Sequence, residues 1–300
     1  DTRTYFKEKD MSDEMENVTN EFPESSNTLK TLHYHQEKIH DFAWFADKRF
    51  KVLKDSVTLP HSSRQVTTWA MFTPNEEDLW REAPDYLGDA TYYYSLWNGD
   101  YPYNQGTAID GTISAGGGME YPNVTVIGES GSAFSLDVVI AHEVGHNWFY
   151  GQVGNNETYR AALDEGFTQF LTAWGLERID GDKMVQKLSS NNYIAKHTKQ
   201  IHPRDRSVYF AYIKDATKNN TPQLNTHSDD FGSALGHGGG YRHVYYKTAS
   251  LLYNLQYVLG DELYLDAMKH YFGTWKIAHP YNEDFRNAII QYTKVDLNWY

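Results

Sequence analysis

The chain has 300 residues, 40% hydrophobic and 15% aromatic, which is enough apolar material for the core of one or two domains. Its net charge of −13 leaves no basic run to offset a phosphate backbone, so we predict no nucleic-acid partner. The chain has no cysteine, which excludes disulfides and thiolate ligands, so any metal must be held by nitrogen and oxygen atoms.

The first part of the chain is polar and then becomes strand-like. Residues 1–29 are rich in charged side chains, and we expect a loop or an excursion from a sheet there. Residues 42–45 and 50–53 are short strand candidates, and residues 66–72 predict a further strand. We predict a domain boundary near residue 60, where the pattern changes.

A Tyr-rich helix and an edge strand are predicted next. The apolar spacing from Glu76 to Trp97 favours a helix. Residues 119–127 have the pattern of a strand, and Pro122 within them suits the edge of a sheet, because proline has no N–H to donate to a neighbour. The backbone of a peptide substrate can extend such an edge as an additional strand.

The strongest chemical signal lies in residues 135–150, whose apolar pattern predicts a buried helix. His142 and His146 are four positions apart, so both rings can face one tetrahedral metal ion, while Glu143 is rotated about 100° away from them. Glu143 is therefore expected to be a base rather than a ligand. With three protein ligands, a fourth position stays open for water, whose pKa the metal lowers towards about 7.

A third ligand is predicted on a second helix, over residues 160–174. Glu165 follows His146 after eighteen intervening residues and begins a polar stripe at helical spacing. The stripe is expected to face the metal cleft. Asp164 has two interpretations: it accepts an N–H from a ligand imidazole, or it is an ordinary acid in the first turn of a helix.

Towards the C-terminus helical patterns dominate, with one exception. Residues 201–240 form a long, irregular stretch, and such loops are usually functional or mobile. Residues 243–259 then predict a helix that ends at Gly260. It carries Tyr245 and Tyr246 on different faces, and either hydroxyl could donate a hydrogen bond to an oxyanion, although a tyrosine in so Tyr-rich a chain is more often part of the core.

Four motifs, in chain order, resemble those of the aminopeptidase N family of gluzincins, which are relatives of leukotriene hydrolase: Gly117–Glu120, His142–Trp148, Asp164–Phe167 and Tyr245–Lys247. The segment His40–Trp44 is more weakly similar to that family's interdomain connection. The resemblance implies an α+β fold, a thermolysin-like zinc peptidase domain with a small mixed sheet and a mostly α-helical lobe. Residues 1–60 would then be the end of a β-domain with its linker, and residues 61–300 the catalytic domain.

The resemblance also implies a role for each matching residue. One Zn²⁺ ion per chain would be held by His142, His146 and Glu165, with Glu143 as the general base. Tyr245 matches the tyrosine that stabilises the oxyanion, which favours it over Tyr246.

Substrate recognition is implied by the remaining motif. Glu120 would bind the free α-amino group of a peptide, next to Gly117, Gly118 and Met119. A buried anion favours a terminal ammonium, and an internal peptide bond offers none. The sequence departs from the family pattern at Tyr121, where asparagine is usual, which puts in doubt the side-chain contact to the substrate backbone.

We therefore predict a zinc-dependent aminopeptidase that hydrolyses the N-terminal bond of peptides by means of a metal-activated water. The predicted partners are peptides with a free N-terminus. The alternatives are a thermolysin-type zinc endopeptidase and a non-catalytic interaction module with a peptidase fold. Most of the family's β-domain would precede residue 1 and the fold would continue beyond residue 300, so we expect an excised catalytic segment.

No stretch approaches the roughly 20 apolar residues that span a bilayer, so no transmembrane segment is predicted. No charged and apolar leader follows Asp1, so we expect that any export signal has been removed or never existed. The sequence leaves the location open and favours an extracytoplasmic one, secreted or periplasmic, with any signal removed.

Overall fold

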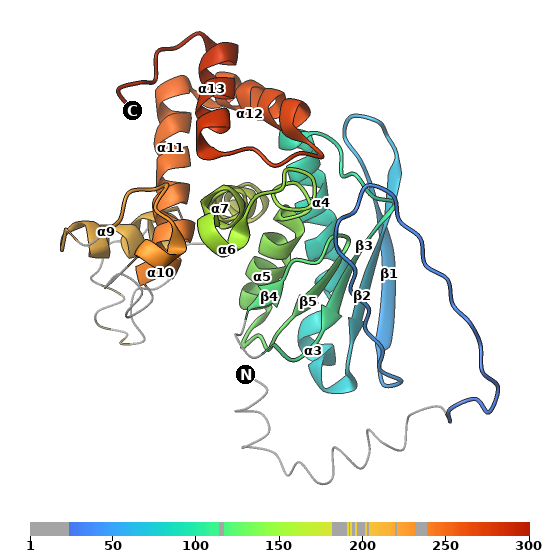
Figure 1. The fold of residues 1–300 in the computed structure, drawn as a ribbon. Helices are drawn as coiled ribbons and strands as arrows, with labels where there is room; N and C mark the ends of the chain where they lie inside the picture. Colours follow the sequence, from blue (N-terminus) through green and yellow to red (C-terminus); the bar gives the residue numbers. More distant parts are fainter. Residues whose placement is uncertain are drawn as a thin grey trace. The chain divides into compact units, whose positions relative to one another are not determined.

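The computed structural model describes most of the chain: residues 24–113, 117–181, 191, 193, 196, 202, 204–219, 221–231 and 239–300 (Figure 1). Most of the predicted polar stretch 1–29 lies outside these residues. The chain forms two compact units, the first from Asp1–Tyr92 with Pro102–Asn147 and the second from Tyr93–Tyr101 with Trp148–Tyr300. None of the helices in the described residues is long and apolar enough to cross a membrane.

The first unit contains a five-stranded mixed sheet (Figure 1). Its strands are β1 (Lys51–Thr58), β2 (Gln65–Phe72), β3 (Gln105–Asp110), β4 (Gly118–Met119) and β5 (Val124–Ile127), in the spatial order β1-β2-β3-β5-β4. The inner pairs β2–β3 and β3–β5 are parallel, whereas the outer pairs β1–β2 and β4–β5 are antiparallel. β1 ends before residue 60 and β2 begins after it, and the two strands pair with each other. The domain boundary near residue 60 stays a prediction.

β2 shows why the sequence pattern predicts a strand. Its side chains alternate between buried and more exposed positions, as expected where one face of a strand covers a core. On the buried face Phe72 stacks on Trp80, with ring centroids 5.8 Å apart. Trp80 belongs to α3 (Glu77–Trp80), which follows a short 3₁₀ turn, η1 (Pro74–Glu76).

One strand prediction is wrong, one is too short, and one strand was missed. Among residues 24–50 the structure has no strand, and Phe42 and Trp44 are 71% and 73% exposed, because strand propensity without a pairing partner is not enough to form a sheet. The second candidate, 50–53, is the start of the longer β1. β3 was missed because a parallel strand buried on both faces shows no alternation.

The strand predicted at 119–127 is interrupted. Pro122 lies in the turn between β4 and β5, where Asn123 adopts a positive φ of 58°. Proline cannot donate to a sheet ladder, so the chain turns there and comes back on itself. β4 nevertheless lies at the edge of the sheet, as the position of Pro122 predicted.

The helix predicted at 76–97 is also interrupted. The chain forms η1 and α3, and then a separate helix, α4 (Ala83–Asn98). Pro84 explains the interruption, because a proline is tolerated in the first turn of a helix but not in its interior. A new helix therefore begins at Ala83 instead of α3 continuing.

The second unit is almost entirely helical, which confirms the predicted helical lobe (Figure 1). In chain order its elements beyond the end of α4 are α6 (Glu157–Arg160), η2 (Ala162–Gly166), α7 (Phe167–Asp180), η4 (Asp205–Tyr209), α9 (Phe210–Ala216), η5 (Ser228–Asp230), α10 (Gly239–Tyr241), η7 (Arg242–Lys247), α11 (Thr248–Leu259), α12 (Asp261–Trp275) and α13 (Asn282–Thr293). Gly260, at a φ of 78°, ends α11 as predicted.

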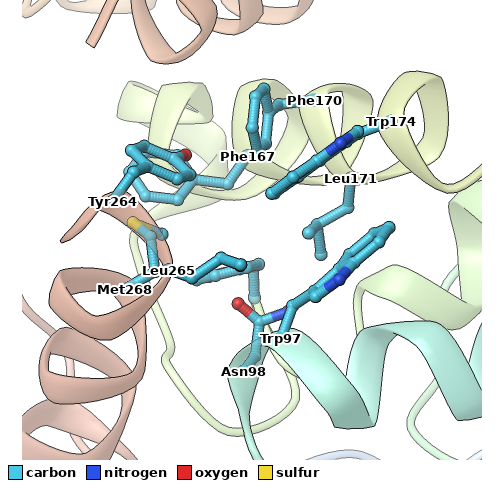
Figure 2. Close-up of a pocket in the computed structure, with 10 residues that line it drawn as sticks. Trp97, Asn98, Phe167, Phe170, Leu171, Trp174, Tyr264, Leu265 and Met268 are labelled. Carbon is cyan, nitrogen blue, oxygen red and sulfur yellow. The ribbon is translucent and has the colours of Figure 1, made fainter. Parts of the chain in front are cut away.

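Aromatic rings form the centre of the second unit. Trp97 and Trp174 stack with centroids 4.5 Å apart and planes 12° apart, and Phe170 meets Tyr264 edge-on at 5.4 Å. Figure 2 shows these rings around a cavity of about 10 Å³. That volume is about the smallest that holds a water molecule, so the aromatic core is closely packed.

The stretch predicted as an irregular loop, 201–240, is helical where the structure describes residues 204–216. Arg204 donates to Glu177 on α7 at 3.0 Å and lies 4.0 Å from the ring centroid of Tyr253 on α11. These long-range contacts attach the helical segment to α7 and α11. Residues 232–238 of that stretch lie outside the described residues.

Candidate functional site

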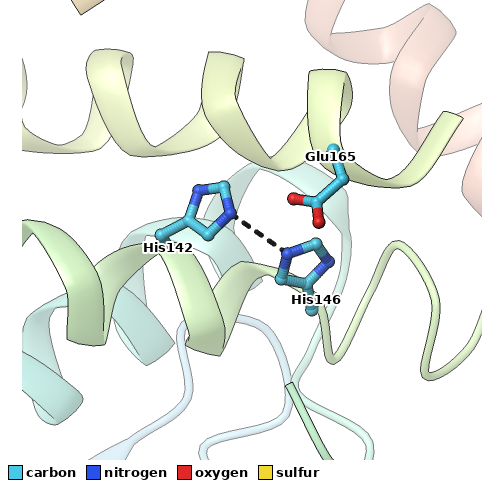
Figure 3. Close-up of side chains that lie close together, drawn as sticks. All are labelled: His142, His146 and Glu165. Atoms are coloured by element: carbon cyan, nitrogen blue, oxygen red, sulfur yellow. Dashed lines mark hydrogen bonds between the residues drawn. The ribbon is translucent and has the colours of Figure 1, made fainter. Parts of the chain in front are cut away.

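The predicted histidine pair lies on α5 (Ala133–Gly145) and its C-cap, in the first unit. The helix begins with a capping box, in which the Ser132 side chain accepts from Ser135 N. His142 and His146 are one turn apart, and Figure 3 shows their Nε2 atoms facing each other at 3.2 Å. Two imidazoles on a tetrahedral zinc ion, each about 2.05 Å from it, would have nitrogens about 3.4 Å apart. The pair therefore fits one metal ion.

The helix that was predicted to run to Tyr150 ends at Gly145. Asn147 explains the early end: its Nδ2 donates to Val144 O at 3.0 Å, and its Oδ1 accepts from Asn123 N at 2.8 Å. The amide thus satisfies a carbonyl at the helix end and ties α5 to the turn before β5. Asn147 was missed in the sequence; its place directly after the histidine motif was the available signal.

Glu143 lies against the edge strand. It is only 5% exposed, and a Cβ atom added to Gly118 would lie 2.4 Å from Glu143 Oε1. A side chain at Gly118 would therefore overlap the carboxylate. Within the predicted substrate motif, Gly118 thus has a definite structural role, which is to leave room for the predicted base.

A second carboxylate lies beside Glu143 in the same unit. One oxygen of Glu120, one oxygen of Glu143 and a ring nitrogen of His146 lie within 4.8 Å of one another, and all three side chains are buried. Two buried carboxylates so close together repel each other unless a cation lies between them. The arrangement can therefore bind a positively charged group.

The rest of the predicted substrate motif is held by β4 and its neighbours. Gly117 has a φ of 75°, which favours glycine, and its carbonyl accepts from Gly128 N at 2.7 Å. The carbonyl of Met119 accepts from Thr125 Oγ1 at 2.8 Å. These contacts fix the backbone that leads into Glu120.

Glu165 and Asp164 lie in the second unit on η2, a π-helical turn rather than the α-helix predicted over 160–174. Single π turns inside helices are frequent at functional sites. Asp164 is 1% exposed, whereas Glu165 is half-buried. The Glu165 side chain offers one carboxylate oxygen as a possible metal ligand atom.

Tyr245 lies on η7, a second π-helical turn at the start of the helix predicted over 243–259. Its ring stacks on Tyr241, with centroids 3.8 Å apart and planes 11° apart. The ring centroid of Tyr246 lies 6.5 Å from that of Tyr245 and 5.9 Å from that of Tyr241, and burial raises the pKa of Tyr246.

η2 and η7 pack against each other. A Cβ atom added to Gly166 would lie 2.2 Å from Thr248 Cβ and 2.7 Å from Val244 O. Gly166 follows Glu165, and Val244 precedes Tyr245, so the structure places Glu165 and Tyr245 on adjoining turns of the second unit.

Comparisons with known proteins identify a family of peptidases. Residues 90–300 match the family model described as the peptidase family M1 domain. The chain is 26% identical to leucine aminopeptidase 2 of Aspergillus clavatus over 188 residues, which is 60% of this chain and 27% of the relative. It is 27% identical to leucine aminopeptidase 2-1 of Meyerozyma guilliermondii over 169 residues, 53% of this chain and 24% of the relative. The matched part is therefore about a quarter of each relative's length.

Solved structures share the fold at low sequence identity. Aminopeptidase A of Legionella pneumophila, in complex with aspartic acid, has a TM-score of 0.61 at 16% identity, covering 83% of this chain and 27% of that one. A mutant M1 zinc metallopeptidase from Deinococcus radiodurans has a TM-score of 0.56 at 14% identity, covering 82% and 50%. These similarities confirm the predicted α+β fold. Since the family model matches most of the chain, the chain belongs to the peptidase M1 family.

Proposed function

We propose that this chain is the catalytic part of a zinc-dependent aminopeptidase that hydrolyses the N-terminal bond of peptides. The observation that carries the proposal is the buried cluster of Glu120, Glu143 and His146 in the first unit. An aminopeptidase needs an anion for the terminal ammonium beside a base for the reacting bond, and this cluster offers both. The names of the two leucine aminopeptidase relatives support the same activity.

We propose that one zinc ion per chain is held by His142, His146 and Glu165. The 3.2 Å separation of the two Nε2 atoms supports this ligand set, because it is close to the spacing that tetrahedral zinc requires. When bound, zinc supplies a Lewis acid that polarises the substrate carbonyl and makes water acidic near neutral pH.

Glu143 is the proposed general base. Its carboxylate takes a proton from the attacking water and then gives it to the leaving amine nitrogen. Burial beside Gly118 holds the carboxylate in one place and keeps bulk water away from it, so the proton transfers at a defined position.

Glu120 is the proposed amine-binding group. Its buried carboxylate accepts hydrogen bonds from the α-ammonium of the substrate, and that positive charge relieves the repulsion between Glu120 and Glu143. A peptide with a blocked N-terminus brings no such charge, so it would leave two like charges together. This difference is the physical basis of the proposed preference for a free N-terminus.

Tyr245 is proposed to donate its hydroxyl hydrogen to the carbonyl oxygen as that oxygen gains negative charge. The stack on Tyr241 fixes the plane of its ring. Asp164 is proposed to accept an N–H from a ligand imidazole, and its burial favours this role over that of a solvated acid in the first helical turn.

The test is the turnover of aminoacyl amides by the zinc-loaded protein, with and without a chelator. We expect hydrolysis that the chelator abolishes, and much slower hydrolysis of the same compounds when they are N-acetylated. Glu143→Gln should lower kcat by about 10²–10⁴-fold while the fold is retained. The exposed Glu129 provides the matched control, Glu129→Gln.

Equal rates on free and acetylated substrates would instead identify an endopeptidase. Stoichiometric zinc without turnover of any such substrate would identify a non-catalytic module. Either result would refute the proposal.

A further inference from the structure

Residues 221–231 form a strap across the second unit, and one end of it is attached to η7. The Lys247 ammonium donates to the carbonyl of Pro222 and, at 3.3 Å, to Thr221 Oγ1. Lys247 is half-buried, and burial lowers its pKa. A buried ammonium needs hydrogen-bond acceptors, so the two oxygens fix the position of the Lys247 side chain. The same hydrogen bonds fix this end of the strap to η7.

The other end of the strap is attached to α6. Three contacts join them: Arg160 Nε donates to Asn225 O at 3.3 Å, Ser228 Oγ donates to Thr158 O at 2.8 Å, and the rings of Tyr159 and His227 stack with centroids 4.3 Å apart. α6 continues almost directly into η2, which carries Glu165. The strap therefore connects the segment leading to Glu165 with the turn that carries Tyr245.

η2 and η7 are thus joined twice. The first connection is direct, through the close approach of Gly166 to Val244 and Thr248. The second runs through the strap from Lys247 to Arg160. The strap thus adds a second connection to the direct packing of the two turns.

We propose that Lys247 is a positioning residue that acts through the strap 221–231 to hold the turn of Glu165 and the turn of Tyr245 in one relative orientation. The inference rests on the proposed function, in which these two residues serve the same reaction. Lys247 does not touch the substrate. Its effect comes from the placement of the Tyr245 hydroxyl, and a misplacement of about 1 Å can cost a large factor in rate.

The test is a double-mutant cycle on the zinc-loaded protein, because the strap has two ends. Lys247→Met removes the ammonium and keeps the length of the side chain. At the far end, one combined variant (Tyr159→Ala, Arg160→Met and Ser228→Ala) removes the ring stack and both side-chain hydrogen bonds. Each variant should lower kcat about tenfold and leave KM within about twofold. The double variant should also lose only about tenfold, because cutting the second end of a released strap changes little.

Two further variants complete the cycle. Lys247→Arg keeps a cationic donor and should restore most of the lost kcat. Lys214→Met, at an exposed lysine on α9, is the matched control and should retain full kcat.

Hydrogen exchange on the metal-free protein provides a measurement that does not depend on activity. In Lys247→Met we expect amide exchange about tenfold faster in residues 221–231 and 242–247, with the exchange of α5 unchanged.

Multiplicative losses of about a hundredfold in the double variant, a wild-type kcat in Lys247→Met, or unchanged exchange in 242–247 would each overturn the inference. If the wild-type protein does not hydrolyse aminoacyl amides, the proposed function fails, and hydrogen exchange still decides whether the strap positions η7.

Discussion

At the scale of single residues, the space around Glu143 is set by its neighbours. Gly118 has no side chain where the carboxylate lies, and Glu120 brings a second carboxylate close to it. The histidine spacing that predicts a metal is local, because residues four apart always meet on one helix face. The proximity of Glu120 to Glu143 joins residues far apart in the chain, and only the family resemblance pointed to it.

The first residue-scale prediction concerns Glu120→Gln. The amide keeps the size of the side chain but removes the charge that the ammonium needs. We expect kcat/KM for free aminoacyl amides to fall by an amount equivalent to about 2–5 kcal/mol, because the ammonium would then be buried unpaired. The ratio of rates on free and acetylated substrates measures the effect. A ratio equal to that of wild type would contradict the role of Glu120.

At the scale of elements, the two π-helical turns are the feature that the sequence pattern does not show. A π turn inserts one extra residue into a helix, and the apolar spacing on either side remains helical. The helices predicted at 160–174 and 243–259 therefore exist, but their first turns are η2 and η7. The two turns are stabilised by the long-range contact at Gly166. The local spacing of apolar residues in the sequence gives no sign of such a contact.

The contact between the two turns predicts opposite effects for two glycine substitutions. Gly166→Ala would place a Cβ atom 2.2 Å from Thr248 Cβ, so we expect a loss of about 1–3 kcal/mol in the free energy of unfolding. Gly273→Ala lies in α12 with nothing within 4 Å of the new Cβ, so it should gain up to about 1 kcal/mol. Urea denaturation of both variants provides the measurement. Equal effects of the two substitutions would refute the close approach at Gly166.

At the scale of the whole molecule, a metal ion held by the proposed ligands would add to the stability of the folded chain. His142 and His146 belong to the first unit and Glu165 to the second. An ion bound only by the folded chain stabilises it by about 4 kcal/mol when the free ion is at 1,000 times its dissociation constant.

The domain boundary at residue 60 and the extracytoplasmic location stay predictions.

We therefore expect zinc to raise the temperature of unfolding and a chelator to reverse the effect. Glu165→Gln should abolish most of this increase, because it removes the only ligand proposed in the second unit. Differential scanning calorimetry with and without zinc measures it. The same zinc-dependent increase in Glu165→Gln and wild type would show that Glu165 is not a ligand.

A second whole-molecule prediction concerns acid stability. Burial, assisted by the charge of Lys247, lowers the pKa of His243 from 6.5 to about 4. The folded chain thus favours the neutral ring. The stabilisation is fully present above pH 6.5 and is lost as the pH falls towards 4, by up to about 3 kcal/mol.

Urea denaturation of the metal-free protein between pH 7 and pH 4 measures this loss. His243→Leu should show a smaller decrease in stability with acid than wild type does. His35→Leu, at an exposed position, should decrease as wild type does. An equal slope in wild type and His243→Leu would exclude His243 as the cause.

The sequence alone indicated the family and predicted the donor set, because the spacing of His142, Glu143 and His146 and the order of the motifs are properties of the chain itself. Only the tertiary structure revealed β3, the two π turns, the space that Gly118 leaves for Glu143, and the strap attached to Lys247. Each of these depends on contacts between residues far apart in the chain. Local periodicity records which side chains share a face of one helix or strand, and it does not record which other element that face will meet.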